Sequence, residues 1–302
     1  MKHLTHLLLL LIITSCNLPK WNQKRLDKKF NRNEVVRDEV DLKNAHINFF
    51  HGGQGDPVLL IHGFGGDAQI TWQKSILDLA EDHYVIAPDL LWFGRSYSTD
   101  PQNLTSQVKS MFDLMDHLKV EKFSLAGISY GGFVALGMTY YQRERVEKLC
   151  IVDSPGTTFD LEVLKDLCRQ QKVNEIPDIF VCKTPQDVQE LSDLGKYKSK
   201  KIPKGILNDT YDLYFAQFHK EQTQLLNTMP AEKEKFMSMS IENFPKSRII
   251  WGEHDMVFPL SEGKKFAKFL GAEIDIIPNA GHAPNLDNFK AFQTALRGFI
   301  TD

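Results

Sequence analysis

Short apolar runs alternate along this chain with longer segments whose apolar residues recur every three or four positions. Residues 56–61 form one such run, and runs of this length are typical of strands buried on both faces of a sheet. Residues 103–118 carry apolar side chains at the spacing of an amphipathic helix. The alternation predicts an α/β fold with a mostly parallel, eight-stranded sheet flanked by helices. The expected strands lie at 34–50 (two antiparallel strands), 56–61, 83–87, 122–126, 148–152, 247–251 and 272–277.

The alternation stops between residues 156 and 245, where the sequence is helical in character and rich in aromatic residues. We interpret 156–245 as a helical cap inserted into a core formed by 34–155 and 246–302. Most of its aromatic side chains are expected to pack between the cap helices, and some should face the cleft below. The candidates for the wall of that cleft are Tyr214, Phe215 and Phe218.

The N-terminal region differs from the rest of the chain. Lys2 precedes an apolar run at 7–13, which is too short for a membrane span, because a spanning helix needs about 20 residues. A basic start, a short apolar run and small residues describe a secretory signal. Residues 16–33 are polar and basic without apolar periodicity, which predicts a tether that can contact anionic headgroups; a plainly solvated linker is the alternative.

The sequence Ile13-Thr14-Ser15-Cys16 resembles the lipobox of bacterial lipoproteins. The resemblance implies that residues 1–15 are a signal peptide removed before Cys16, which then carries the lipid. It also implies a membrane-anchored protein of the bacterial cell envelope that faces the periplasm or the exterior. The alternative is an ordinary signal peptide that happens to contain a cysteine.

The composition limits the functional classes. With 302 residues, of which 42% are hydrophobic and 25% charged, the chain suits one large α/β domain with an insertion. The formal net charge of -3 gives no reason to expect a nucleic-acid partner, and the oligomeric state is left open. Cys150 is expected to be a buried thiol; Cys168 and Cys182 are favoured as free thiols, with a disulfide between them left open. No cysteine has a metal-ligand spacing with histidine, so no metal site is predicted.

The first candidate for chemistry is Ser129, in the turn Gly127-Ile128-Ser129-Tyr130-Gly131. A buried strand precedes this G-x-S-x-G turn and a buried helix follows it, which is the context that a nucleophilic serine requires. The backbone must reverse sharply to expose the hydroxyl, so glycine is needed on both sides of the serine. The alternative is a chance occurrence of the pattern in a loop.

A second glycine-rich loop, His62-Gly63-Phe64-Gly65-Gly66, follows the strand at 56–61. We expect the backbone N–H groups of Phe64 and Tyr130 to form an oxyanion hole beside Ser129. The alternative is an ordinary glycine loop between a strand and a helix.

A serine hydroxyl needs a base to accept its proton and a third group to orient that base. Ser129, Asp255 and His282 occur in the order nucleophile, acid and histidine, each just past a predicted strand. The carboxyl ends of parallel strands meet at one edge of a sheet, so we expect these residues to meet there as general base (His282), orienting acid (Asp255) and nucleophile. Asp153 is the rival acid, and Glu253 is a weaker rival.

Over about residues 34 to 300 the chain resembles the α/β-hydrolase fold superfamily, in its branch with a helical cap. Relatives often have Pro-Gly where Leu91-Trp92 stands here, so Trp92 and its neighbour Phe93 become further candidates for the pocket wall; a packing role for Trp92 is the alternative. The resemblance rests on His62-Gly63-Phe64-Gly65-Gly66, Asp89 with Phe93-Gly94-Arg95-Ser96, Gly127-Ile128-Ser129-Tyr130-Gly131-Gly132, Gly252-Glu253-His254-Asp255 with Pro259, and Gly281-His282-Ala283-Pro284.

This resemblance implies a serine esterase or lipase, similar to monoacylglycerol lipases, that cleaves carboxylic esters with apolar acyl chains and needs no metal or organic cofactor. The implied partners are a small-molecule ester or lipid and, through the lipid anchor, a membrane. Ser129 argues against haloalkane dehalogenases and epoxide hydrolases, which use an aspartate nucleophile. A carbon–carbon bond hydrolase and a cofactor-free haloperoxidase of the same fold remain alternatives, and a noncatalytic lipoprotein that binds an apolar ligand is the alternative from another class.

Overall fold

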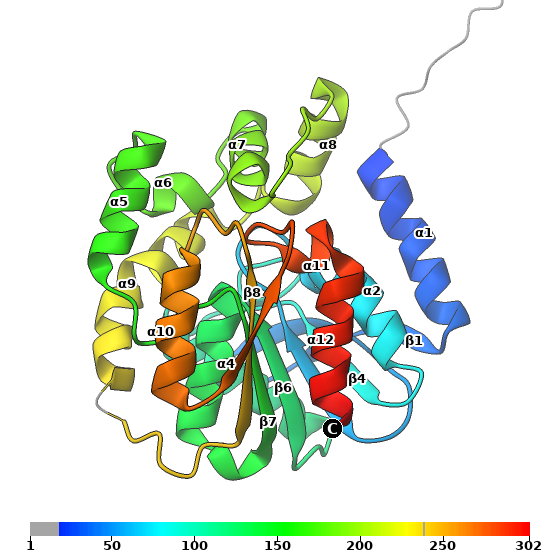
Figure 1. The fold of residues 1–302 in the computed structure, drawn as a ribbon. Coiled ribbons are helices and arrows are strands. Elements are labelled where there is room, and N and C mark those ends of the chain that lie inside the picture. The colour runs from blue at the N-terminus through cyan, green and yellow to red at the C-terminus, as the bar shows by residue number, and fades with distance from the viewer. Residues whose placement is uncertain (1–17, 238) are drawn as a thin grey trace, which may run out of the picture.

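A central β-sheet runs through the protein and carries helices on both of its faces (Figure 1). The structure, a computed structural model, describes residues 18–237 and 239–302. Within these residues the sheet has nine strands in the order β1-β2-β4-β3-β6-β7-β8-β9, with the short strand β5 paired to β2. The predicted α/β fold and its mostly parallel sheet are confirmed. The strands are β1 (Val35–Asp41), β2 (Ala45–Gly52), β3 (Pro57–Ile61), β4 (Tyr84–Pro88), β5 (Tyr97–Ser98), β6 (Phe123–Ile128), β7 (Val146–Val152), β8 (Lys246–Gly252) and β9 (Glu273–Ile277).

The register of the parallel strands brings their carboxyl ends to one edge. Ile128 at the end of β6 pairs with Val152 at the end of β7, and Val152 pairs with Ile250 of β8. Gly252 at the end of β8 in turn pairs with Ile277 at the end of β9. The segments that follow these four strands therefore begin side by side, which is where the sequence predicts the functional residues.

Side chains of successive strand residues point to opposite faces of the sheet and build two cores. Leu59 and Leu125 pack with residues of the helices on one face, and Leu60 and Ala126 pack with residues of the helices on the other. Helices α3, α4 and α10 supply the first core, and α2 and α12 supply the second. The helices outside the cap are α1 (Leu18–Arg32), α2 (Ala68–Leu79), α3 (Leu104–His117), α4 (Tyr130–Tyr141), α10 (Leu260–Leu270), α11 (Pro284–Asp287) and α12 (Phe289–Thr301), with a short 3₁₀ helix η1 (Arg143–Arg145).

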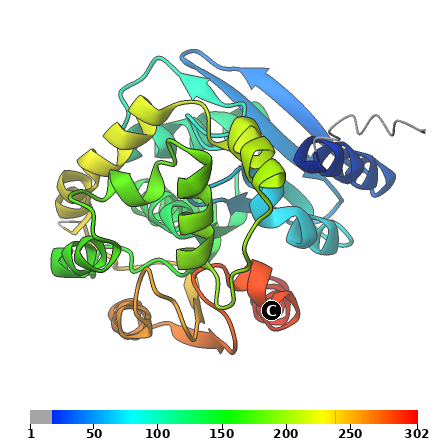
Figure 2. The same cartoon turned by 90° about the horizontal axis from the view of Figure 1, so that it is seen from above.

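Helices α5 to α9 lie between β7 and β8 in the chain, in the stretch that the sequence predicts to be a helical insertion. Figures 1 and 2 show them over the edge of the sheet at which the parallel strands end. They form a roof above the segments that follow β6, β7 and β8. Their bounds are α5 (Leu161–Gln171), α6 (Pro177–Phe180), α7 (Pro185–Gly195), α8 (Lys204–Tyr214) and α9 (His219–Met237).

The N-terminal segment differs from the predicted tether. Residues 18–32 form helix α1, which packs on the domain through Phe30, whose ring lies 5.1 Å from the ring of Phe50 in an edge-on arrangement. Asp27 accepts hydrogen bonds from Arg37 at 2.9 Å and from the side chain of Gln69 at 2.8 Å. The inward face has too few apolar side chains to produce a visible stripe, so the periodicity could not reveal this helix.

The predicted signal peptide and Cys16 lie outside the described residues. Within residues 18–237 and 239–302, none of the helices combines the length and the apolar composition that crossing a bilayer requires.

Gly131 offers a test of how tightly the turn after β6 is packed. A Cβ added at Gly131 would collide with the backbone carbonyl oxygens of Ile61 and His62, whereas one added at Gly195 would meet nothing within 4 Å. We expect Gly131→Ala to lower the free energy of unfolding by about 3 kcal/mol, because backbone atoms cannot move aside as a flexible side chain can. The matched control Gly195→Ala should stay within about 1 kcal/mol of the wild type or gain stability, since this glycine closes a helix. Urea unfolding measures both; equal stabilities would contradict the steric account.

Candidate active site

Ser129 stands at the turn between β6 and α4 in a strained backbone conformation. Its φ of 54° and ψ of -120° lie in a region that residues other than glycine rarely adopt. Hydrogen bonds hold the turn, from Ser129 N–H to the carbonyl of Val152 at 2.8 Å and from Gly132 N–H to the carbonyl of Ser129 at 2.9 Å. A Cβ at Gly127 would collide with the backbone of Gly131. The close approach of β6 and α4 therefore requires Gly127, and the approach of α4 to the end of β3 requires Gly131.

The structure brings the three predicted residues of the triad into one hydrogen-bonded chain. His282, in the loop between β9 and α11, has its Nε2 2.8 Å from Ser129 Oγ and its Nδ1 2.9 Å from Asp255 Oδ2. Asp255 lies in the loop after β8, where its Oδ1 accepts hydrogen bonds from the N–H groups of Val257 at 2.8 Å and Phe258 at 3.0 Å. Its carboxyl group is fully shielded from solvent.

These contacts determine which nitrogen of His282 carries the proton. The Asp255 carboxylate can only accept, so Nδ1 donates to it and Nε2 is left as the acceptor for the hydroxyl of Ser129. The arrangement is suited to take a proton from Ser129 and to stabilise the imidazolium that results. Its residues come from three loops that the register of the parallel sheet places together.

The rival acid, Asp153, lies directly behind Asp255 and makes no hydrogen bond to His282. Asp153 is completely buried; its Oδ1 accepts a hydrogen bond from Gly252 N–H at 2.8 Å, and its Oδ2 has no other partner besides the neighbouring carboxyl group. Burial, and then the charge of Asp255, raise the pKa of Asp153 well above its ordinary value. This shift favours the protonated form of Asp153, whereas the Asp255 carboxylate accepts hydrogen bonds from Val257, Phe258 and His282.

The weaker rival, Glu253, faces away from this network. Its carboxylate lies 3.5 Å from Nε2 of His254, and nearly half of its side chain is exposed. The geometry leaves Asp255 as the carboxylate that contacts His282.

One cluster among the described residues has the spacing of a metal site. Possible ligand atoms of Asp153, Asp255 and His282 lie within 4.8 Å of one another. Both nitrogens of His282 are already engaged, one with Asp255 and one with Ser129, so this imidazole offers no lone pair to a metal ion without breaking the triad. The donor set thus fits proton transfer better than metal binding.

The glycine loop after β3 lies directly against the nucleophile. A Cβ added at Gly63 would come within 3.0 Å of the Cβ of Ser129. His62 anchors this loop: its Nε2 accepts a hydrogen bond from Leu90 N–H at 2.9 Å, and burial lowers the pKa of His62, which keeps the ring neutral as this acceptor role demands. Tyr130 is the first residue of α4, so its N–H is one of the four that have no acceptor within the helix. The oxyanion role of Phe64 and Tyr130 remains a prediction that this placement suits.

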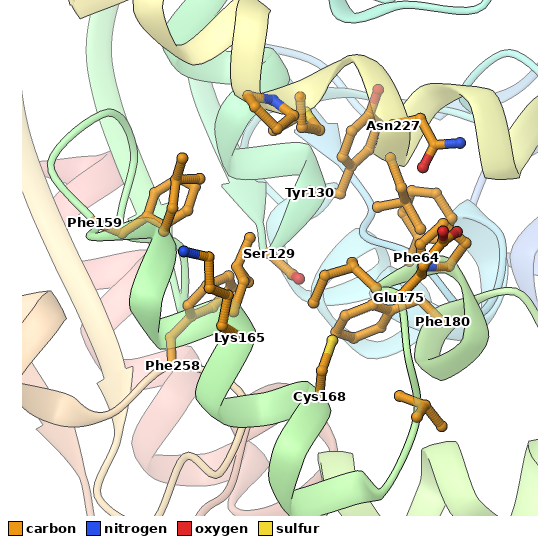
Figure 3. A pocket seen from close by; sticks show the side chains of 18 of the residues that line it. Phe64, Ser129, Tyr130, Phe159, Lys165, Cys168, Glu175, Phe180, Asn227 and Phe258 are labelled. Atoms are coloured by element: carbon orange, nitrogen blue, oxygen red, sulfur yellow. The ribbon is translucent and has the colours of Figure 1, made fainter.

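A largely apolar cavity of about 780 Å³ opens beside Ser129, between the turn and the cap helices α5, α6 and α9 (Figure 3). Its size is typical of small-molecule sites. Polar side chains also reach it, namely Lys165, Cys168, Arg169, Asn174, Glu175 and Asn227. The apolar part of the wall is formed by Phe64, Tyr130, Phe133, Phe159, Leu161, Leu164, Val173, Ile176, Pro177, Phe180, Leu226, Met229, Pro230 and Phe258.

The prediction of the cavity wall is wrong for all five candidates, because Trp92, Phe93, Tyr214, Phe215 and Phe218 are absent from it. Trp92 is buried, and its ring N–H donates to the carbonyl of Ser98 at 3.3 Å, so it has the packing role that the sequence left as the alternative. Phe93 packs behind the rings of Phe64 and Tyr130.

The three cap candidates belong to other clusters. Tyr214 and Phe215 pack with Leu207 and Val188 between α7 and α8, and Phe218 packs at the margin of the main core. The sequence shows which residues are aromatic but not which cap helix covers the serine. The wall is formed by α5, α6 and α9 instead of α8.

The three cysteines of the described chain are free thiols, in agreement with the favoured reading. Cys150 is fully buried in β7, as expected. Cys182 lies in the cluster between α7 and α8, whereas Cys168 lines the cavity.

The division of roles between the two buried acids can be tested by labelling Ser129 with a fluorophosphonate. We expect Asp255→Asn to slow labelling at least about a hundredfold, because the amide cannot stabilise the imidazolium. Asp153→Asn should slow it by less than about fivefold, since the amide N–H₂ can still donate to Asp255. A larger loss from Asp153→Asn would assign the orienting role to Asp153 instead.

Comparison with known proteins agrees with this fold. A model described as the alpha/beta hydrolase family matches residues 58–293. The 2-hydroxymuconate semialdehyde hydrolase of Pseudomonas sp. (strain CF600) is 24% identical over 284 residues, which cover 90% of this chain and 96% of that protein. Monoacylglycerol lipase ABHD6 of Homo sapiens is 25% identical over 76% of this chain and 71% of that protein.

A solved structure of a membrane phospholipase A, described as a bacterial virulence factor, superimposes with a TM-score of 0.74. Its sequence is 22% identical, and the match covers 96% of this chain and 93% of that one, so the likeness concerns the fold. The family match extends from β3 into α12 and includes the turn at Ser129 and the loops of Asp255 and His282. The chain therefore belongs to the alpha/beta hydrolase family.

Proposed function

We propose that this hydrolase cleaves carboxylic esters with apolar acyl chains through an acyl-enzyme on Ser129. The observation that carries the proposal is the hydrogen-bonded chain from Ser129 through His282 to Asp255, with Ser129 at the wall of a largely apolar cavity. A relative named as a monoacylglycerol lipase supports the choice of an ester substrate.

The reaction follows from the contacts at Ser129. As His282 Nε2 takes the hydroxyl proton, Oγ attacks the ester carbonyl carbon, and the carbonyl oxygen becomes an oxyanion that the Phe64 and Tyr130 N–H groups bind. The tetrahedral intermediate collapses, the carbon–oxygen bond to the alcohol breaks, and the leaving alkoxide takes the proton from His282. A water molecule then gives a proton to His282 and attacks the acyl carbon, which releases the acid and restores Ser129.

The cavity wall suggests where the acyl chain and the polar head group of the substrate would lie. The apolar side chains of α6 and α9 suit an acyl chain, because burying it removes apolar surface from water. Lys165, Arg169 and Glu175 lie among the polar lining residues and suit contact with a polar head group. Lys165 and Arg169 are exposed and paired with Glu162 on the same helix, so their charges are largely balanced there.

A second candidate reaction is carbon–carbon bond hydrolysis. It is favoured by the relative named as a 2-hydroxymuconate semialdehyde hydrolase, which this chain matches over nearly its whole length. The same triad would serve it, and Lys165 or Arg169 would be placed to contact a substrate carboxylate. Parallel assays with p-nitrophenyl esters and with 2-hydroxymuconate semialdehyde separate the two reactions.

The membrane anchor at Cys16 is a further proposal, and its basis is the lipobox-like sequence alone. Mass spectrometry of the mature N-terminus tests it. A mature chain that begins at any residue other than a lipidated Cys16 would refute both the anchor and the proposed place in the bacterial cell envelope.

Replacing the nucleophile is the direct test of the reaction. We expect Ser129→Ala to reduce kcat for a p-nitrophenyl ester by about four orders of magnitude or more, because the variant lacks the hydroxyl that would form the acyl-enzyme. Steady-state kinetics measures the loss, and a fluorophosphonate should label the wild type but not the variant. Activity retained in Ser129→Ala would overturn the assignment; a folded wild type that neither reacts nor is labelled would favour the noncatalytic ligand-binding alternative.

The place of the acyl chain can be tested by narrowing the cavity. We expect Ile176→Trp to lower kcat/KM about tenfold or more for p-nitrophenyl dodecanoate while the value for the acetate stays within about threefold, because only the long chain needs the filled space. The matched control Ile276→Trp adds the same bulk to a partly exposed position in β9. Equal losses for both esters in Ile176→Trp would place the acyl chain elsewhere.

A further inference from the structure

Helix α1 presents two different faces. Its inward face is formed by Gln23, Leu26, Asp27 and Phe30, which recur at helical spacing and are buried or half-buried. The residues on the opposite side of the helix are exposed and form what we call the outward face of α1. They are Leu18, Trp21, Arg25, Lys28 and Arg32.

Positive charge is concentrated on this helix. Six of its 15 residues are basic, and they are Lys20, Lys24, Arg25, Lys28, Lys29 and Arg32. Its single acidic residue, Asp27, lies on the inward face, where Arg37 and Gln69 bind it. The chain as a whole has a formal net charge of -3, so α1 is positively charged while the rest of the protein carries a net negative charge.

Two large apolar side chains stand among these charges. Trp21 is 57% exposed and Leu18 is 47% exposed, at the end of α1 where the described chain begins. The guanidinium of Arg25 lies 5.8 Å from the centre of the Trp21 ring. An exposed indole and leucine cost free energy in water, and an indole beside basic groups is typical of helices that rest in the interface of a bilayer.

The outward face is held in a fixed orientation. The ring contact of Phe30 with Phe50 and the hydrogen bonds of Asp27 fasten α1 to the hydrolase core. The helix also packs beside α8 of the cap, and its N-terminal end lies toward the end of the molecule that carries the cap (Figure 1). A surface bound by α1 would therefore lie close to the cap.

We propose that the outward face of α1 binds the surface of an anionic lipid bilayer, with Trp21 and Leu18 entering the headgroup region and the basic residues contacting lipid phosphates. Basic residues close to an anionic membrane attract it additively. The proposal does not depend on the ester chemistry, nor on a lipid at Cys16, although that residue would lie only two positions before Leu18.

Charge alone would also fit a nucleic acid, and the apolar residues decide between the two. A duplex offers phosphates to the basic residues but has no apolar layer for Trp21 and Leu18 on the same face. The remainder of the chain is acidic overall and would repel a polyanion that extends past one helix. A bilayer satisfies both the charges and the apolar pair.

The test is co-sedimentation of the full chain with vesicles of phosphatidylcholine alone and of phosphatidylcholine with phosphatidylglycerol. The measured quantity is the affinity for the anionic vesicles divided by the affinity for the phosphatidylcholine vesicles. Any contribution of residues 1–17 that does not depend on lipid charge is the same in both affinities and cancels in this ratio. We expect the wild type to prefer the anionic vesicles at least about tenfold at low salt and to lose this preference at high salt. The triple variant Arg25→Glu, Lys28→Glu and Arg32→Glu should lose the preference at low salt, and Trp21→Ala should weaken binding to anionic vesicles.

A matched control reverses three exposed lysines on other helices, through Lys264→Glu, Lys268→Glu and Lys290→Glu in α10 and α12. It should keep the wild-type preference although its net charge equals that of the triple variant. Thermal unfolding shows whether each variant is folded. An unchanged preference in the α1 variant, an equal loss in the control, or binding to duplex DNA in place of vesicles would each overturn the proposal.

Discussion

The close approach of backbone segments at Gly127 and Gly131 is the constraint on which the rest of the site depends. No side chain fits at either position, because a Cβ would meet backbone atoms of the opposite segment or of β3. This contact forces the chain to turn sharply between β6 and α4, and it holds Ser129 at a positive φ. The loop after β3 lies against the same turn. Ser129 and the glycine loop after β3 are thus positioned by one steric arrangement.

The sheet supplies the other partners through its register. Because β6, β7, β8 and β9 end side by side, the loops after them deliver Ser129, Asp153, Asp255 and His282 to one place. That crowding buries two carboxyl groups side by side, which disfavours a charge on both of them. Burial and the neighbouring Asp255 raise the pKa of Asp153, while the backbone N–H groups of its own loop donate to the carboxylate of Asp255.

The cap and helix α1 lie outside the sheet and determine what the site and the nearby surface can contact. The cap closes an apolar cavity over Ser129, and α1 carries basic and apolar side chains outward beside the cap. An apolar cavity suits a substrate that partitions into lipid, and a helix suited to an anionic surface would keep the enzyme close to such substrates.

The sequence by itself determined the order of the strands along the chain, the turn at Ser129 and the identity of His282, because apolar periodicity, glycine requirements and position after a strand are local properties. It favoured Asp255 as the acid and kept Asp153 as the rival. Only the tertiary structure decided that Asp255 and not Asp153 contacts the histidine, since both follow a strand and their separation depends on packing. It also decided the cavity wall, to which Phe180 contributes and the expected Phe215 does not. Finally, it revealed α1, whose inward face has few apolar residues and packs on the domain through the contact of Phe30 with Phe50. Contacts between segments distant in the chain leave no periodic trace in the sequence, and these contacts determined each of the differences.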